Sequence, residues 1–145
     1  MKIYISSSFR NLHAVQSLAA LLREQGHDIL DWTRQAPPIP SGTPPHERRA
    51  LLDSDDTKQA FTFCAESAAS ADLFIYLGPS GQDSGVELGI AHAAGVYVIG
   101  LPGPFEQSGT MLSGCVNLWA HSVDHILQLA DAACMTDGGF CFDLQ

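Results

Sequence analysis

One carboxylate is distinguished by the residues around it. Glu87 lies between Gly85 and Gly89, in a segment whose apolar pattern predicts a helix over residues 83–94. A carboxylate near a helix start, flanked by glycines that let a ligand or a neighbouring strand approach closely, can stabilise positive charge or attack an electrophilic carbon. The same position is compatible with a carboxylate that interacts only with the helix dipole. Position alone leaves both roles open for Glu87.

Other polar and aromatic side chains are candidates for the same site. Tyr4, in the apolar segment 2–6, is either a core residue or a phenol that orients Glu87, and Trp32 either stacks on a base or packs in the core. The remaining candidates for ligand binding lie in two short polar segments, and they are Ser6, Ser7 and Arg10 in the first and Ser80, Asp83 and Ser84 in the second. Together they predict a site for a small polar ligand.

The histidines and cysteines do not indicate a metal or a disulfide scaffold. His121 and His125 have i, i+4 spacing, but no third ligand is evident, so neither a metal nor a cofactor is expected. The four cysteines form no Cys-x-x-Cys pair and are few for this length, so we expect reduced thiols. No Walker loop, Gly-x-Gly-x-x-Gly, Gly-x-Ser-x-Gly or His-Glu-x-x-His motif occurs.

Alternating strands and helices must position these residues. Strands are predicted at 2–6, 27–30, 73–77 and 96–101, with a short fifth at 116–119. Helices are predicted at 12–22, 57–71, 83–94 and 123–130, and the proline-rich stretch 31–56 is expected to be a long loop. The alternation predicts an α/β fold with a flavodoxin-like, doubly wound, parallel five-stranded sheet in the order 2-1-3-4-5.

This strand order also predicts the place of a ligand. The chain reverses direction across the sheet between strands one and three, so the loops 6–10 and 78–87 open a crevice at the carboxyl edge, beside Glu87. One domain is expected over residues 1–133, followed by a C-terminal tail, 134–145, that has no clear pattern.

The overall charge restricts the partners. A formal net charge of −9 would repel polymeric nucleic acid, which proteins bind largely through Lys and Arg. A single phosphate of a nucleotide could still be held by local donors such as Arg10. The apolar runs are too short for a signal peptide or a membrane span, so a cytoplasmic protein without a membrane partner is expected.

The residues around Glu87 resemble a known family. Four segments within residues 1–101 are similar to the nucleoside 2-deoxyribosyltransferase family, and they are Lys2-Ile3-Tyr4-Ile5, Ala71-Asp72, Gly85-x-Glu87-Leu88-Gly89-x-Ala91 and Gly95-Val96-Tyr97-Val98. The resemblance implies that residues 1–133 form a nucleoside 2-deoxyribosyltransferase-like domain in which Glu87 attacks the anomeric carbon and Tyr4 positions it. It also implies a nucleoside or nucleotide substrate, hydrolysis or base transfer at the N-glycosidic bond, and a homo-oligomer.

Two positions differ from the family pattern. Cys64 replaces a usual aspartate, and Gly81 replaces a usual aspartate or serine, although Ser80, Asp83 and Ser84 are near enough to substitute for the second. Both family groups would help the base to leave or hold the sugar. The nucleophile and the tyrosine are therefore retained, whereas the general acid is not assigned.

Two alternative functions stay open. The segment 3–10 is similar to the first strand and loop of TIR-type domains, whose catalytic members use a glutamate on NAD. The glycines around Glu87 favour the deoxyribosyltransferase resemblance instead. Cys64 and Gly81, in place of acids, are also consistent with a non-catalytic nucleotide-binding module.

Overall fold

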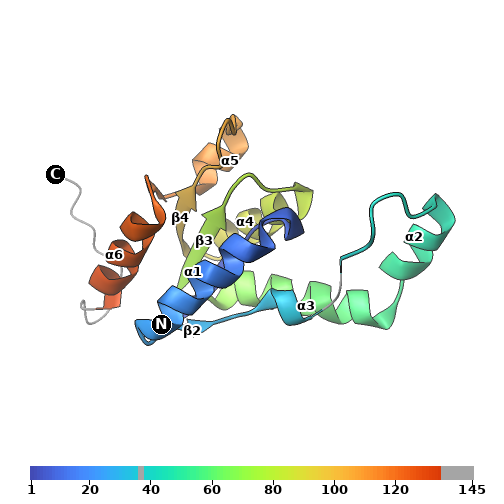
Figure 1. Ribbon diagram of the computed structural model, residues 1–145, viewed down its shortest axis with the longest axis horizontal. Helices are drawn as coiled ribbons and strands as arrows, with labels where there is room; N and C mark the ends of the chain where they lie inside the picture. The colour runs from blue at the N-terminus through green and yellow to red at the C-terminus, as the bar shows by residue number, and fades with distance from the viewer. Residues whose placement is uncertain (36–37, 135–145) are drawn as a thin grey trace.

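The protein is built around one parallel β-sheet (Figure 1). The computed structural model describes residues 1–35 and 38–134, so most of the predicted tail 134–145 lies outside the described residues. The strand order β2-β1-β3-β4-β5 confirms the predicted flavodoxin-like, doubly wound α/β fold. In chain order the strands are β1 (Lys2–Ser6), β2 (Asp28–Ile29), β3 (Leu73–Leu77), β4 (Tyr97–Leu101) and β5 (Leu118–Trp119).

Helices cover both faces of the sheet (Figure 1). On one face α1 (Leu12–Glu24) contacts α6 (Val123–Cys134). On the other, α4 (Gln82–Ala93) contacts both α3 (Asp55–Ser70) and α5 (Thr110–Cys115). Helix α3 begins two residues before its predicted start because the Ser54 hydroxyl accepts a hydrogen bond from the Thr57 backbone N–H and caps the first turn.

The segment predicted as one long loop contains two short helices. A 3-10 helix, η2 (Trp32–Arg34), follows β2, and α2 (Pro45–Leu52) precedes α3. The expectation of a loop was wrong at α2 because Pro45 occupies the first helical turn, where a missing N–H leaves no hydrogen bond unmade and the fixed φ is already helical. Helix α2 buries none of its own residues and stands away from the sheet beyond α3 (Figure 1).

Strand β1 presents different side chains to the two faces of the sheet. Ile5 faces α1, whereas Tyr4 packs against Phe74 of β3 on the other face, with ring centroids 5.6 Å apart. Because strand side chains alternate, Ile3 points with Ile5 and Ser6 with Tyr4. All four are almost completely buried, which fixes the register of β1.

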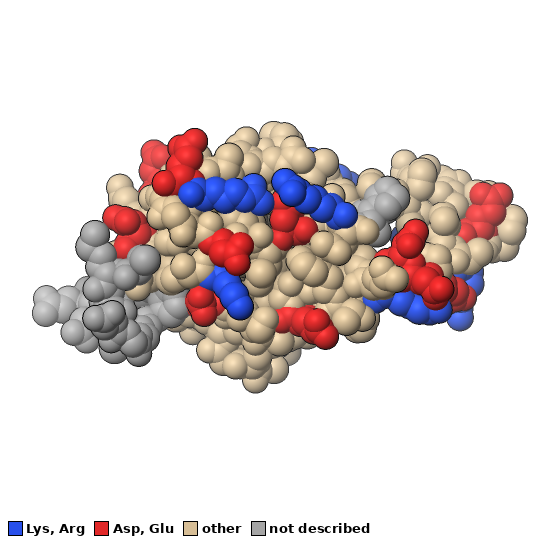
Figure 2. Space-filling model, turned by 90° about the horizontal axis from the view of Figure 1, so that it is seen from below, with Lys and Arg blue, Asp and Glu red and all other residues tan. Residues whose placement is uncertain are grey.

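Charged side chains of opposite sign lie close together on the surface. On the face in Figure 2, acidic and basic groups are interspersed and no broad basic patch is visible. Arg49 pairs with Asp53 at 3.5 Å, and Lys58 pairs with Asp55 at 3.3 Å. Within residues 1–35 and 38–134, no helix is both long and apolar enough to cross a membrane.

Candidate active site

Two hydroxyl groups from β1 hold the carboxylate of Glu87. The Tyr4 hydroxyl donates to Oε1 at 3.0 Å, and the Ser6 hydroxyl donates to Oε2 at 2.5 Å. Tyr4 and Ser6 are two residues apart on β1 and point to the face that α4 covers, where Glu87 lies in the second turn of the helix. The structure therefore brings the predicted nucleophile and the predicted orienting tyrosine together.

The hydroxyl of Ser6, which was predicted as a substrate ligand, contacts Glu87, and its role toward a substrate stays a prediction. The sequence contained a signal for this contact, since residues i and i+2 of a strand share a face and Tyr4 was already a candidate partner. With both oxygens bonded, the half-buried carboxylate is fixed in orientation.

Burial sets the ionisation behaviour of this group. It raises the pKa of Glu87 above its ordinary value, and the negative charge of Asp83, one turn earlier on α4, raises the pKa further. Hydrogen bonds from Ser6 and Tyr4 lower it and limit this rise. Burial also raises the pKa of Tyr4 far above its usual range, so the phenol keeps its proton and remains a donor.

The thiol of Cys64 lies beside this pair. Cys64 projects from α3 and interacts with both the Tyr4 phenol and the Glu87 carboxylate. Burial raises the pKa of the Cys64 thiol to about 11, and the charge of Glu87 contributes to this rise. The thiol is therefore neutral at physiological pH, at the position where the resemblance implies an aspartate.

The predicted ligand residues Arg10, Asp83 and Ser84 make no hydrogen bond to Glu87 within the described residues. Asp83 is exposed on α4, Ser84 is buried in the same helix, and Gly81 precedes its first residue. Arg10 lies in the 3-10 helix η1 (Phe9–Asn11) and is exposed, and its guanidinium makes no hydrogen bond or ion pair with residues 1–35 or 38–134. Their roles as ligands stay predictions.

Hydrogen bonds join the loops that follow β1 and β3. Ser7 donates through its hydroxyl to the Leu77 carbonyl at 2.5 Å and accepts from the Asn11 amide at 3.1 Å. The same amide donates to the Pro79 carbonyl at 2.8 Å. Ser7, predicted as a substrate ligand, thus connects the two loops that flank the predicted crevice.

A second phenol and carboxylate pair extends this connection to the loop after β4. The Tyr76 hydroxyl donates to Glu106 at 2.5 Å and accepts from the Ser80 hydroxyl at 2.8 Å. The other Glu106 oxygen accepts from the Gly103 backbone N–H at 2.9 Å. Burial and the hydrogen bond to Glu106 raise the pKa of Tyr76 to about 12. Sequence reasoning missed this pair, because nothing in the sequence indicated that Glu106 folds back onto β3.

The candidate Trp32 has a packing role in this structure. Its indole N–H donates to the Ile5 carbonyl at 2.7 Å, and its ring meets Phe9 edge-on with centroids 4.8 Å apart. The side chain is buried, as in the packing alternative. Base stacking by Trp32 stays a prediction.

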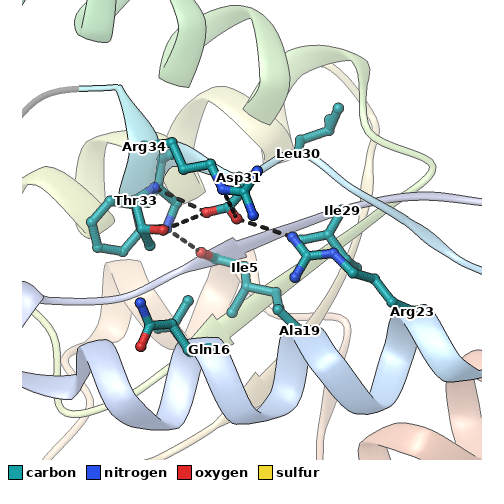
Figure 3. A pocket seen from close by; sticks show the side chains of 11 residues that line it. Ile5, Gln16, Ala19, Arg23, Ile29, Leu30, Asp31, Thr33 and Arg34 are labelled. Atoms are coloured by element: carbon teal, nitrogen blue, oxygen red, sulfur yellow. Dashed lines mark hydrogen bonds and ion pairs between the residues drawn. The ribbon is translucent and has the colours of Figure 1, made fainter.

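A cavity of about 330 Å³ lies beside Trp32, between α1 and the segment after β2 (Figure 3). Asp31 lies at its rim and accepts from Arg23 at 3.0 Å, while Arg34 approaches the same carboxylate oxygen to 3.4 Å. Ile5 forms part of the wall, so β1 separates this cavity from Tyr4, Ser6 and Glu87 on its other face. The ion pairs fix η2 against α1, which is a structural role.

The two candidate metal ligands near the C-terminus interact with each other. The rings of His121 and His125 stack with centroids 5.3 Å apart, and the His125 Nδ1 accepts from the His121 backbone N–H at 3.3 Å. In the described part of the chain, no three His, Cys, Asp or Glu side chains are arranged so that they could hold a metal ion.

Comparison with known proteins supports the fold. No protein-family model and no curated protein matches the sequence. Among solved structures, a 2-deoxyribosyltransferase from Bacillus psychrosaccharolyticus is 22% identical, with a TM-score of 0.62 over 88% of this chain and 90% of that one. A CMP N-glycosidase from Clostridium botulinum is 17% identical, with a TM-score of 0.58 over 88% and 96%. A conserved protein from Enterococcus faecalis V583 is 18% identical, with a TM-score of 0.67 over 91% and 98%. The chain therefore has a nucleoside 2-deoxyribosyltransferase-like fold.

Proposed function

We propose that the protein breaks the N-glycosidic bond of a nucleoside or nucleotide, with Glu87 as the nucleophile. The observation that carries this proposal is the half-buried Glu87 carboxylate, held between the hydroxyls of Tyr4 and Ser6. Cleavage develops positive charge at the anomeric carbon, and a fixed carboxylate can stabilise this charge or capture the carbon covalently. Similarity of fold to a 2-deoxyribosyltransferase and to a CMP N-glycosidase supports the same chemistry.

The reaction would proceed in two steps at Glu87. In the first step an oxygen of Glu87 bonds to the anomeric carbon while the bond between that carbon and the base breaks. In the second step water or another base attacks the same carbon and releases the carboxylate, giving a hydrolase or a transferase. Tyr4 and Ser6 hold the carboxylate in one orientation through both steps, which lowers the entropic part of the barrier.

The proposal includes the state and location of the enzyme. A small-molecule nucleoside or nucleotide is the partner, and the exposed Arg10 guanidinium is available to a phosphate group. We also propose a cytoplasmic homo-oligomer, supported by Phe61 of α3 and Val86 of α4, which are 66% and 59% exposed although apolar. A monomer with full activity, measured by light scattering and kinetics, would contradict the oligomer.

The decisive experiment is a substrate panel. Purified protein is incubated with ribonucleosides, 2′-deoxynucleosides, their 5′-monophosphates and NAD, with and without an added second base, and the products are separated by chromatography. We expect free base or an exchanged nucleoside from at least one nucleoside or nucleotide. Nicotinamide release from NAD, with no release from nicotinamide mononucleotide or from any other nucleoside or nucleotide, would favour the TIR-like alternative, and no release from any compound would favour the binding module.

A further inference from the structure

In the part of the chain that the structure describes, the surroundings of Glu87 lack a group that could protonate a departing base. Within residues 1–35 and 38–134, the hydroxyl protons of Tyr4 and Ser6 are already donated to Glu87. The third neighbour is the Cys64 thiol, which is too weak an acid to give up its proton near neutral pH. Gly81 has no side chain, so neither position where the resemblance implies an acid has one.

Among the described residues, Asp83 is the remaining acidic side chain close to this centre. It is exposed on α4 one turn before Glu87, and its charge raises the pKa of both Glu87 and Cys64. Asp83 acts on both neighbours as a negative charge and not as a hydrogen-bond donor. Asp83 therefore adds a second negative charge beside the nucleophile, within a chain of net charge −9.

The absence of a proton donor and the negative charge of Asp83 both favour a particular charge on the substrate's base. A neutral base that leaves takes the electron pair of the glycosidic bond and becomes an anion unless it receives a proton. A base that is already positively charged becomes neutral when it leaves, so it needs no proton from the enzyme. The negative charges of Asp83 and Glu87 also attract such a base and repel an anionic leaving group.

We propose that this site acts on nucleosides or nucleotides whose base carries a positive charge, such as an N-ribosylated pyridinium or an N7-alkylated purine. The inference rests on the proposed function, with Glu87 as the nucleophile. The glycosidic bond breaks with its electron pair on the base nitrogen, a neutral base departs, and the anomeric carbon bonds to Glu87. Water then releases the sugar, and one proton passes to solvent.

The test compares matched substrates that differ in charge. The wild-type kcat/KM is measured for 7-methylguanosine against guanosine and for nicotinamide mononucleotide against cytidine monophosphate. A general acid typically contributes about 10²–10⁴-fold, so its absence predicts at least about a hundredfold preference for each charged substrate. Rates within tenfold of each other in either pair would overturn the proposal while leaving the proposed function intact. Release from none of the four compounds would overturn this proposal alone if the wider panel shows base release, and would overturn the proposed function as well if the panel shows none.

Two variants of Cys64 test the missing acid directly. Cys64→Asp places a carboxyl beside Glu87, where burial and like charge favour the protonated form. We expect this variant to cleave guanosine at least tenfold faster than the wild type, whereas Cys64→Asn, of the same shape but without an acidic proton, gives no gain. If both variants unfold at the native temperature and cleave guanosine at equal rates, the inference that a missing acid limits the reaction is overturned. If Cys64→Asp fails to fold, the wild-type ratios of kcat/KM for charged and neutral substrates test the proposal.

Discussion

Glu87→Gln separates the catalytic role of this residue from a structural one. The substitution keeps the size of the side chain and one oxygen that can accept from Tyr4 or Ser6, but it removes the negative charge and the nucleophilic oxygen. If Glu87 forms the bond to the anomeric carbon, kcat should fall by at least about 1,000-fold, which corresponds to about 4 kcal/mol of activation free energy.

The effect on stability should be small and can be worked out from the geometry. Burial raises the pKa of Glu87, so folding favours its protonated form, and the free energy of unfolding is reduced as the pH rises through the folded pKa. Gln carries no charge, so at neutral pH the variant does not have this reduction in the free energy of unfolding. Glu87 lies beyond the first turn of α4, where the helix dipole contributes little, so we expect a change of less than about 1 kcal/mol.

The assay measures base release beside thermal unfolding for the wild type and two variants. Glu66→Gln is the matched control, because Glu66 is also helical but is exposed on α3. The control should keep wild-type turnover, and both variants should keep the midpoint of unfolding within about 4 °C. Undiminished turnover in Glu87→Gln would refute the assignment of the nucleophile.

Three further substitutions test other features of the molecule. Tyr4→Phe removes a hydrogen bond to the Glu87 carboxylate worth about 1.5–3 kcal/mol, so kcat should fall about ten- to a hundredfold, and the acid limb of the pH–rate profile should move to higher pH. Burial lowers the pKa of His27 in the folded protein, so its contribution to the free energy of unfolding is present above about pH 6.5 and is lost as the pH falls through the folded pKa. Urea titrations should show this decline in the wild type and a smaller decline in His27→Leu. Gly103→Ala would place a Cβ 2.0 Å from Pro79 Cδ and should lower the free energy of unfolding by about 1–3 kcal/mol, whereas Gly89→Ala, with open space around it, should not lower it.

Each of these has a distinct contrary outcome. An unchanged pH–rate profile in Tyr4→Phe would show that the phenol does not act on Glu87. The same pH dependence of stability in the wild type and in His27→Leu would remove His27 as its cause. A native midpoint of unfolding in Gly103→Ala would show that the loops after β3 and β4 are not in close contact.

The fold could be predicted because its signals are local. Strand β3 is a continuous apolar run, and Gly26 adopts a φ of 86° just after α1, where a left-handed glycine ends a helix. Helix α2 was missed for a reason that is also local, since a proline near a helix start favours the helix, whereas one in its interior disrupts it.

The site could be predicted only in part, because some of its contacts depend on packing between distant segments. Tyr4 and Glu87 were candidates from their positions, the family resemblance implied their roles, and the strand order predicted the crevice beside Glu87. The contact of Cys64 with this pair depends on how α3 packs against the sheet and α4. The contact between Glu106 and Tyr76 depends on the path of a loop, which follows no periodic pattern.

The alternation of side chains along β1 divides the site into positions that can change and positions that cannot. Tyr4 and Ser6 share their strand with the buried Ile3 and Ile5, so any shift of register that moved the two hydroxyls would also remove the apolar pair from its packing against α1. Cys64 and Asp83 lie on helices, where one side chain can be replaced while the backbone keeps its place. Under the proposed mechanism, changes in leaving-group chemistry, whether by natural variation or by design, should therefore accumulate on α3 and α4, while the hydroxyls that hold Glu87 stay constant.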